Sequence, residues 1–412
     1  DPADNAGCDG ATPLCEAAVD GNRCVGCRVD GDCADEFAGQ CVAGSCQACD
    51  VADNGGCGAD TPFCIESPGG VLCAACRDNN DCNGDAGDKI FGKDGDFLTA
   101  PSSGQLFGEC VANELGPVLD SLDCNILEFG AGGGDLAKSV CSALGESHDF
   151  HSYSYHIIEP NESLWVDQKT ATKDLSGGFF WHKSLPRDLS KGVLIANEVL
   201  DAMPATRYLV DKGTVQELGV ALSDQELVWK EKSTDVPEQI KRVLKGYEDG
   251  YRTEMINGLE PWLNSIFSSV EELVFFIIDY GYPGSEFFRE DRLDGTLRCY
   301  FKHTVLNDPF QLLGLQDITT SVNFSTVADI AAGIGFDILG FTTQERFLVN
   351  NKIEEIFVRS NSDDPVENYL LAQEAKRLLL PTEMGQYIKV MALGKNFSGH
   401  LRGFVNDESG RL

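Results

Sequence analysis

Hydrophobic and polar positions follow two alternating periods from residue 89 onward. Short apolar runs of strand length are separated by longer stretches in which apolar residues recur every three or four positions. Strands that alternate with helices predict an α/β domain with a sheet covered by helices on both faces. The expected strands are 125–129, 154–159, 192–197, 273–279 and 389–393, and the expected helices are 136–144, 238–244, 261–270, 327–334 and 368–379. Residues 207–230 are expected to form a strand hairpin attached to that sheet.

The first predicted strand runs into a glycine-rich turn and then into a helical pattern. Gly130, Gly132 and Gly134 have the spacing G-x-G-x-G, and Glu128 stands two residues ahead. A dinucleotide fingerprint would place its third glycine at the position of Asp135, so the turn lacks the spacing for a pyrophosphate. An acidic residue followed by G-x-G-x-G resembles the nucleotide loop of class I methyltransferases, which use S-adenosylmethionine. The resemblance implies that the cofactor lies against the bare backbone of the three glycines and that Glu128 approaches its cationic end. The alternative is a plain tight turn.

Polar side chains follow two further predicted strands. Glu159 ends the strand 154–159, where a carboxylate can accept both hydrogen bonds of a ribose diol. The alternative role is that of an acid at a helix N-terminus. Asn197, expected on the cofactor side, ends the strand 192–197 and is followed by Glu198 and Asp201.

The edge formed by the carboxyl ends of the strands is where open α/β sheets bind ligands. Glu198 and Asp201 are therefore the predicted catalytic pair. Two carboxylates can grip a planar guanidinium through charged, bidentate hydrogen bonds, and one of them can accept a proton during methylation. The alternative is that both residues cap the next helix.

Three further residues are candidates for substrate binding. Tyr280 and Tyr282 follow the apolar strand 273–279 and are expected to line an acceptor channel, or else to be half-buried aromatic residues. Asp96 lies in a Gly-Asp-Phe sequence that is either part of the site or a turn. The chain has no HExxH sequence, no P-loop and no G-x-S-x-G sequence, so no metal site is predicted.

The N-terminal part of the chain has a different composition. Thirteen of the 17 cysteines lie between Cys8 and Cys82, and between them stand mainly Gly, Asp, Asn and Ala. Five cysteines recur at an offset of 49 residues: Cys8, Cys15, Cys24, Cys27 and Cys33 recur as Cys57, Cys64, Cys73, Cys76 and Cys82. A segment with so few large apolar residues needs cross-links to fold. We therefore predict a disulfide-rich segment over residues 1–86 and a separate domain over residues 87–412.

Two other interpretations of this segment stay open. Three C-x-x-C pairs, which begin at Cys24, Cys46 and Cys73, are also compatible with zinc. The repeat resembles the cysteine-rich modules of secreted bacterial surface proteins, which implies an extracellular or cell-surface location.

The chain of 412 residues has a formal net charge of −34. This charge argues against a nucleic acid partner, because phosphate binding needs basic patches. It favours a basic protein or peptide substrate, or simply reflects an acidic, solvated surface. No run of about 18 apolar residues occurs, so no membrane span is predicted.

Several blocks in a fixed order resemble the MidA-like methyltransferases, a family that includes the mitochondrial complex I assembly methyltransferase and its bacterial relatives. The resemblance covers residues 89–404. The matching blocks are Ile90-Phe-Gly-Lys-Asp-Gly-Asp-Phe-Leu-Thr-Ala-Pro101, Leu127-Glu-Phe-Gly-Ala-Gly132, Asn197-Glu-Val-Leu-Asp-Ala-Met-Pro204, Asp279-Tyr-Gly-Tyr282, Gly295-Thr-Leu-Arg-Cys-Tyr300 and Leu378-Leu-Leu-Pro-Thr-Glu-Met-Gly385. The chain departs from the family pattern at Ser102, where Glu is usual, and at Asn323, where Asp is usual.

The resemblance implies a Rossmann-like class I sheet and methyl transfer from S-adenosylmethionine to protein arginine. Through the mitochondrial member, the resemblance also implies that the product is symmetrically dimethylated arginine and that the protein is linked to the assembly of respiratory complex I. It also implies a cytoplasmic bacterial or a mitochondrial location. The alternatives are a non-catalytic binding or assembly protein with the same fold, and a secreted cysteine-rich surface protein with a passenger domain. We make no prediction of the oligomeric state.

Overall fold

The structure is a computed structural model, which describes residues 99–147, 153–175, 177–187, 189–224, 226–301, 304–306 and 308–412. It also describes the backbone of six short strands in the N-terminal part, β1 (Leu14–Glu16), β2 (Arg23–Val25), β3 (Gln40–Val42), β4 (Ser45–Gln47), β5 (Phe63–Ser67) and β6 (Gly70–Ala74). The chain divides into two compact units, one of Asp1–Gly87 with Leu312–Gln316 and one of Asp88–Gln311 with Asp317–Leu412.

The short N-terminal strands form three antiparallel pairs. β1 pairs with β2 with Cys15 opposite Cys24, and β5 pairs with β6 with Cys64 opposite Cys73. The two pairs are therefore related by the same 49-residue offset as the sequence repeat. The cysteine side chains, and with them the disulfide and zinc predictions, lie outside the described residues.

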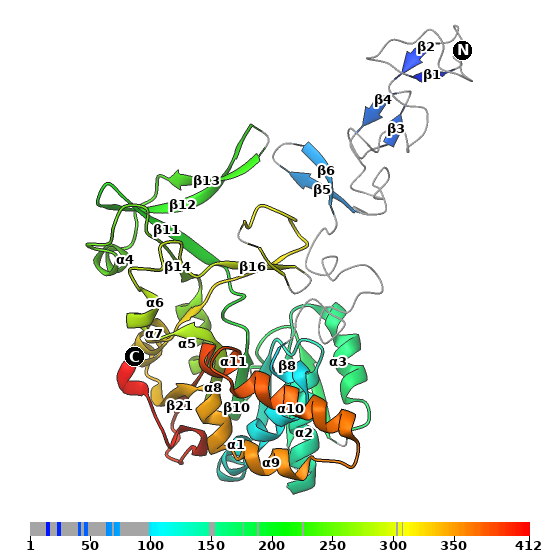
Figure 1. Ribbon diagram of the computed structural model, residues 1–412, viewed down its shortest axis with the longest axis vertical. Helices are drawn as coiled ribbons and strands as arrows, with labels where there is room; N and C mark the ends of the chain where they lie inside the picture. The colour runs from blue at the N-terminus through cyan, green and yellow to red at the C-terminus, as the bar shows by residue number, and fades with distance from the viewer. Residues whose placement is uncertain are drawn as a thin grey trace. The chain divides into compact units, whose positions relative to one another are not determined.

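The larger unit is built on a mostly parallel sheet in which one strand, β21 (Ile388–Lys395), runs antiparallel (Figure 1). The order along the sheet is β20 (Asp337–Thr343), β21 (Ile388–Lys395), β15 (Glu272–Tyr282), β10 (Lys191–Asn197), β7 (Asn125–Phe129), β8 (Ser154–Ile158) and β9 (Gly178–His182). Strands β15, β10, β7, β8 and β9 are parallel, whereas β21 runs antiparallel to both of its neighbours. The strand order reverses between β7 and β10, which makes the carboxyl ends of these strands the expected ligand site.

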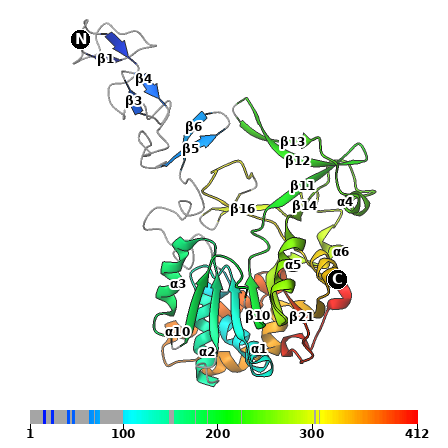
Figure 2. The same cartoon turned by 180° about the vertical axis from the view of Figure 1, so that it is seen from behind.

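Helices cover both faces of the sheet (Figures 1 and 2). Successive residues of a strand point to opposite faces. In β7, Ile126 accordingly joins one buried cluster and Leu127 joins the other. In β10, Val193 and Leu194 divide in the same way. The predicted Rossmann-like α/β fold is therefore confirmed for the described residues.

The helices of the two layers come from both ends of this unit. The first cluster includes residues of α1 (Leu106–Leu122) and α2 (Asp135–Ser147), and the second includes residues of α5 (Leu259–Ser269) and α7 (Phe324–Ile334). The remaining α-helices are α3 (Trp165–Thr172), α4 (Glu238–Val243), α6 (Gly284–Phe287), α8 (Gln344–Asn350), α9 (Ile353–Arg359), α10 (Pro365–Leu379) and α11 (Met384–Tyr387). Among the described helices, none combines the length and the apolar character that a membrane crossing requires.

Two smaller sheets stand apart from the central one. Strands β11 (Ala205–Asp211), β12 (Thr214–Ser223), β13 (Glu226–Lys232) and β14 (Arg252–Ile256) form an antiparallel sheet in the order β13-β12-β11-β14. The prediction that residues 207–230 attach to the main sheet was therefore wrong. This sheet has its own core, in which Tyr208 and Val210 pack with Ile240 and Leu244 near α4.

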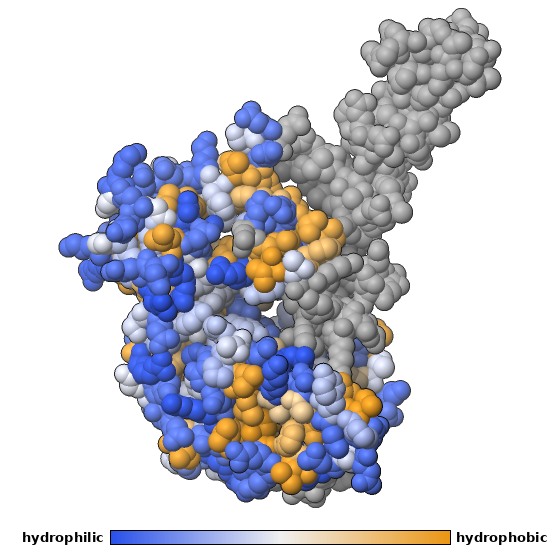
Figure 3. Space-filling model, in the orientation of Figure 1, coloured by the Kyte–Doolittle hydropathy of each residue, from blue (hydrophilic) through white to orange (hydrophobic). Residues whose placement is uncertain are grey.

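The second small sheet contributes directly to the site. Strands β16 (Arg298–Phe301), β17 (Thr304–Leu306) and β18 (Asp317–Thr319) pair antiparallel, with β16 in the middle. Tyr300 lies opposite Asp317, and Arg298 lies opposite Thr319. Hydrophilic side chains cover much of the face seen in Figure 3, with apolar patches between them.

Candidate active site

The glycine-rich turn after β7 has a backbone conformation that other residues rarely adopt. The φ angles of Gly130, Gly132 and Gly134 are +61°, +52° and +89°. A Cβ atom on Gly134 would lie 3.1 Å from the Cα atom of Gln168 in α3. The buried Gln168 side chain donates a hydrogen bond to the Gly132 carbonyl at 3.0 Å and accepts one from the Trp181 indole at 3.0 Å. The turn is therefore held close to α3 with its glycine backbone bare of side chains.

Glu128 is buried within the sheet that supports the turn. Its carboxylate accepts a hydrogen bond from the Tyr155 hydroxyl on the neighbouring strand at 2.8 Å. Burial raises the pKa of Glu128 to about 8, and the hydrogen bond from Tyr155 opposes this rise. A direct contact between Glu128 and the cofactor stays a prediction.

Glu159 directly follows β8 at the same edge of the sheet. Its Oε1 atom accepts a hydrogen bond from the Asn161 backbone N–H at 2.9 Å. Burial raises the pKa of this carboxyl, while hydrogen bonds from Asn161 and Gln168 lower it. The 3-10 helix after it, η4 (Glu162–Leu164), is capped by Asn161, whose side chain accepts the Ser163 N–H. Glu159 is thus fixed by the turn, and its binding to ribose stays a prediction.

The turn after β10 is organised by a buried carboxylate in β15. Oδ2 of Asp279 accepts hydrogen bonds from the backbone N–H groups of Val199, Leu200 and Asp201 at 3.1, 2.8 and 3.3 Å. Glu198 adopts a φ of +53°, which is rare for a residue with a side chain. Residues 198–204 form a turn that leads into β11, with no helix following, so the capping alternative for Glu198 and Asp201 was wrong.

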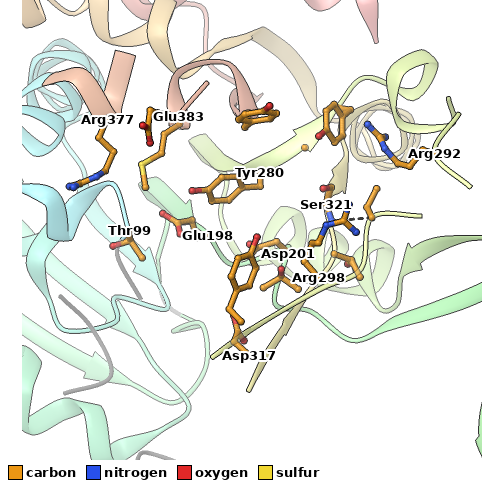
Figure 4. A pocket seen from close by; sticks show the side chains of 18 residues that line it. Thr99, Glu198, Asp201, Tyr280, Arg292, Arg298, Asp317, Ser321, Arg377 and Glu383 are labelled. Atoms are coloured by element: carbon orange, nitrogen blue, oxygen red, sulfur yellow. Dashed lines mark hydrogen bonds between the residues drawn. The ribbon is translucent and has the colours of Figure 1, made fainter. Parts of the chain in front are cut away.

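Four predicted residues line one cavity of about 640 Å³, shown in Figure 4. They are Glu198, Asp201, Tyr280 and Tyr282, from the ends of β10 and β15. Five further charged residues line this cavity, and no local sequence pattern predicted a role for them: Arg292, Arg298, Asp317, Arg377 and Glu383. Asp317 lies in Gln316-Asp-Ile-Thr319, a further block that resembles the family, and Arg298 and Glu383 lie in the blocks 295–300 and 378–385. These blocks are the signal that could have identified the three residues.

The predicted cofactor-binding residues do not line this cavity. They are the three glycines of the turn after β7 with Glu128, Glu159 and Asn197. The two groups nevertheless adjoin, because a Cβ atom on Gly130 would lie 3.4 Å from Cγ2 of Val199. Asn197 donates from Nδ2 to Oε1 of Glu198 at 3.3 Å, and its buried Oδ1 atom has no partner among the described residues. The site therefore has a glycine-lined part and a carboxylate-lined part side by side.

The carboxylates of the cavity raise one another's pKa values. Burial and the charge of Asp201 raise the pKa of Glu198 to about 8, and burial and the charge of Asp317 raise that of Asp201 to about 7. Burial also raises the pKa of Asp317. A cation bound among these groups would favour their charged forms. The cavity is thus suited to a positively charged group.

The segment that begins at Thr99 closes one side of the cavity. Thr99 lines it, and the Ala100 N–H donates to Oε1 of Glu198 at 3.4 Å. Helix α10 holds the segment, because Glu374 accepts the Leu106 N–H at 2.7 Å and Arg377 donates to Ser103 Oγ at 3.2 Å. Asp96 lies outside the described residues.

Both departures from the family pattern have local structural roles. Ser102 accepts a hydrogen bond from the Thr99 N–H at 2.9 Å through its hydroxyl. Asn323 caps α7, because its Oδ1 atom accepts the Thr326 N–H at 3.1 Å. The partners in these hydrogen bonds, Thr99 and Thr326, lie outside the glycine turn.

The structure thus contains the predicted Rossmann-like sheet, with the glycine turn after β7 and two carboxylates after β10 at its carboxyl edge. The model of a family described as putative S-adenosyl-L-methionine-dependent methyltransferases matches residues 110–342. The chain belongs to this family. The protein is an S-adenosylmethionine-dependent methyltransferase, as the sequence predicted.

Curated relatives of this methyltransferase have names that state an acceptor. The "Protein arginine methyltransferase NDUFAF7 homolog, mitochondrial" of Drosophila melanogaster is 26% identical over 346 residues, which cover 74% of this chain and 76% of the relative. The human "Protein arginine methyltransferase NDUFAF7, mitochondrial" is 24% identical over 352 residues, which cover 74% of each chain.

A solved bacterial structure resembles this methyltransferase over most of its length. It is a likely methyl transferase of the COG1565 superfamily from Burkholderia thailandensis bound to S-adenosyl-homocysteine. The TM-score is 0.74 with 30% sequence identity, and the match covers 79% of this chain and 87% of that chain. The bare glycine turn and the unpartnered Oδ1 atom of Asn197 fit the cofactor that the family uses.

Proposed function

We propose that this methyltransferase acts on arginine side chains of a protein substrate, with Glu198 and Asp201 as the catalytic residues. The observation that carries the proposal is the cavity itself, in which these two carboxylates lie near Tyr280 and Asp317 lines the same space (Figure 4). The arginine methyltransferase names of the curated relatives support the same acceptor.

The grouping of Glu198, Asp201 and Asp317 in one cavity supports a cationic acceptor over a neutral one. In the free protein, Glu198 and Asp201 have pKa values of about 8 and about 7, so part of the population is protonated at neutral pH. A guanidinium stays charged at any physiological pH and can hydrogen-bond a carboxylate in a bidentate way. Its binding therefore expels protons from the pair and creates the charged form that the reaction needs.

S-adenosylmethionine supplies an activated methyl group at its sulfonium. The role of the chain is to hold the attacking nitrogen at about 3 Å from the methyl carbon and in line with the bond that breaks. We assign the orientation of the guanidinium to Glu198 and Asp201. As the nitrogen–carbon bond forms, the nitrogen gives one N–H proton to a carboxylate of this pair, so the methylated guanidinium keeps its single positive charge.

The residues proposed to hold the cofactor are those of the adjoining part of the site. Gly130, Gly132 and Gly134 leave the backbone accessible to adenosine, and Glu159 is placed to accept the ribose hydroxyls. Asn197 offers its unpartnered Oδ1 atom to a donor group. Glu128 is proposed to bind nearest the cationic end. Tyr280 and Tyr282 are proposed to flank the acceptor, with Asp96 as a further substrate residue.

The test is a methyl-transfer assay with the full chain, labelled cofactor and arginine-containing peptides, read by mass spectrometry. E198Q and D201N are each expected to lower kcat about 100-fold, because each removes a carboxylate able to take the proton. D329N, at an exposed acid of α7, is the matched control and is expected to keep the wild-type rate. Methylation of lysine or of a small molecule instead of arginine would contradict the proposal.

Symmetric dimethylation and a link with complex I assembly extend the same proposal. The fragmentation pattern of a dimethylated product distinguishes one methyl group on each terminal nitrogen from two on the same nitrogen. An exclusively asymmetric product would contradict the symmetric assignment and leave the arginine assignment standing.

A further inference from the structure

Three arginines line the same cavity as the carboxylates, and none has a carboxylate partner among the described residues. They are Arg292, Arg298 and Arg377. Of the nine other described arginines, Arg187, Arg242 and Arg402 likewise form no such ion pair, and six each pair with an Asp or Glu side chain: Arg207, Arg252, Arg289, Arg346, Arg359 and Arg411. Asp and Glu outnumber Lys and Arg by 66 to 32 in the sequence, so composition alone does not explain why cations without acidic partners gather here.

Two of these arginines are held by neutral groups. Arg292 donates to the backbone carbonyls of Glu286 and Phe287 and lies 4.2 Å from the centre of the Tyr282 ring. Arg377 donates to the Ser103 hydroxyl on the side of the cavity near Thr99. Both cations therefore have defined positions in the wall, and neither forms an ion pair with a described Asp or Glu side chain.

Among the described residues, Arg298 hydrogen-bonds through its side chain only to its own segment of the chain. Its guanidinium is exposed and donates to the adjacent backbone carbonyl of Leu297 at 2.8 Å. Arg298 and Tyr300 occupy alternate positions of β16, so they share one face of the small sheet. Their partners in β18 are Thr319 and Asp317, and all four residues line the cavity.

This register places a positive and a negative charge at a defined separation. Arg298 and Asp317 are diagonal neighbours across β16 and β18, and such positions lie about 7–8 Å apart. In an extended peptide, residues two positions apart also point to the same side, about 7 Å from each other. The acidic part of the cavity and Arg298 therefore match two side chains of opposite charge, two residues apart, on one extended acceptor.

We propose that the preferred acceptor is an arginine with an acidic side chain two residues away, and that Arg298 binds this acid. The inference rests on the proposed arginine methylation and specifies its substrate class. The target guanidinium binds among the carboxylates of Glu198, Asp201 and Asp317, and the acidic side chain two residues away in the peptide pairs with Arg298. A free main-chain carboxylate offers the same chemistry, and the structure favours a side chain because the spacing fits an extended chain.

The test compares capped peptides that differ only two residues before or after a single arginine, where they carry Glu, Gln or Lys. With Glu on one of the two sides of the arginine, kcat/KM is expected to be about fivefold above that of the matching Gln peptide at low salt. Most of this difference is expected to be a lower KM. R298Q is expected to bring the ratio of the two kcat/KM values close to one, and R298K to keep most of it. R187Q, which changes an exposed arginine outside the cavity lining, is the matched control and is expected to keep the wild-type ratio.

The possible outcomes separate this inference from the proposed function. Equal rates for the Glu and Gln peptides, a preference for Lys, or an unchanged ratio in R298Q would each overturn the acidic-neighbour preference and leave arginine methylation standing. A second comparison uses a peptide that ends in arginine, with either a free or an amidated C-terminus. If the free carboxylate alone raises kcat/KM about fivefold, the carboxylate that binds Arg298 is that of the main chain, and the side-chain assignment fails. If no arginine acceptor is methylated, the proposed function fails, and this inference fails with it.

Discussion

Oδ2 of Asp279 lies 2.8 Å from the backbone nitrogen of Leu200 and accepts its hydrogen bond. The same oxygen accepts from Val199 and Asp201, and Oδ1 accepts from the Tyr280 N–H at 2.8 Å. One buried side chain from β15 thus fixes the turn that carries the two catalytic candidates.

Replacement of Asp279 separates the hydrogen-bonding role of this side chain from its charge. Burial and the charge of Asp201 raise its pKa well above the usual range, so the neutral form is favoured and an amide oxygen can replace it. D279N is expected to lower the free energy of unfolding by about 1–2 kcal/mol, because the amide oxygen can serve the turn while the amide NH2 then faces the Tyr280 N–H. D279A is expected to lower it by about 3 kcal/mol, because the alanine leaves several buried N–H groups without a partner. Urea denaturation measures both values, and equal losses would contradict the assigned role.

Removal of the Glu198 charge is expected to stabilise the protein in a pH-dependent way. An ordinary glutamate has a pKa of about 4.3, and the pKa of Glu198 in the folded chain is about 8. Because the folded state favours the protonated form, this contribution to stability is present below the unfolded pKa and is lost as the pH rises through the folded pKa. E198Q should therefore have the same Tm as the wild type at pH 4, and a Tm about 4 °C higher at pH 8. Thermal denaturation at both pH values checks this, and a lower Tm for E198Q at pH 8 would contradict it.

A side chain at Gly134 is expected to weaken cofactor binding. An alanine at Gly134 has an unfavourable φ and places its Cβ 3.1 Å from Gln168, which would push α3 away from the turn. G134A is expected to weaken the binding of S-adenosylhomocysteine at least tenfold, or by about 1.4 kcal/mol, in a calorimetric titration. Gly213 is the matched control, because its φ of +70° is also positive and a Cβ there meets open space. Equal affinities of the two variants would show that the turn does not hold the cofactor.

A thiol count tests the predicted cysteine-rich segment. Cys110, Cys124, Cys141 and Cys299 are buried free thiols, and burial raises the pKa of each, so they react slowly in the folded protein. The remaining 13 cysteines are odd in number, so complete pairing leaves one more thiol. Denaturation without a reductant should then expose five reactive thiols, the four buried ones plus one. A count of 17 after removal of metal would favour the zinc alternative.

Local patterns were sufficient for the central strands. The predicted strand 125–129 coincides with β7, and the strand 273–279 lies within β15, because continuous apolar runs bounded by turn residues define such strands well. Helix α1 was not predicted, since Gly108, Gly116 and Pro117 interrupt its pattern. Its packing explains one of these residues, because a Cβ on Gly108 would lie 1.9 Å from Ser139 Oγ in α2.

The predicted part of the site consists of residues that directly follow strands. Glu198 and Asp201 could be placed because the end of β10 is a local feature. Asp317 and Arg298 come from a separate small sheet, and their approach depends on how distant segments pack. Asp279 was recognised as part of a sequence block, but its bonds to the turn depend on the parallel pairing of β10 with β15. No local pattern contains that information.

Because α10 binds the segment 99–106, the parts of the site form in a fixed order while the chain is being synthesised. The cavity is lined by residues from Thr99 to Tyr387, and Glu374 and Arg377 hold its first segment in place. During translation, a nascent chain can form the turns after β7 and β10 long before α10 leaves the ribosome. It cannot form the complete acceptor cavity until that helix has been synthesised. A chain that ends before α10 therefore lacks both the Arg377 wall of the cavity and the bonds that hold the segment 99–106.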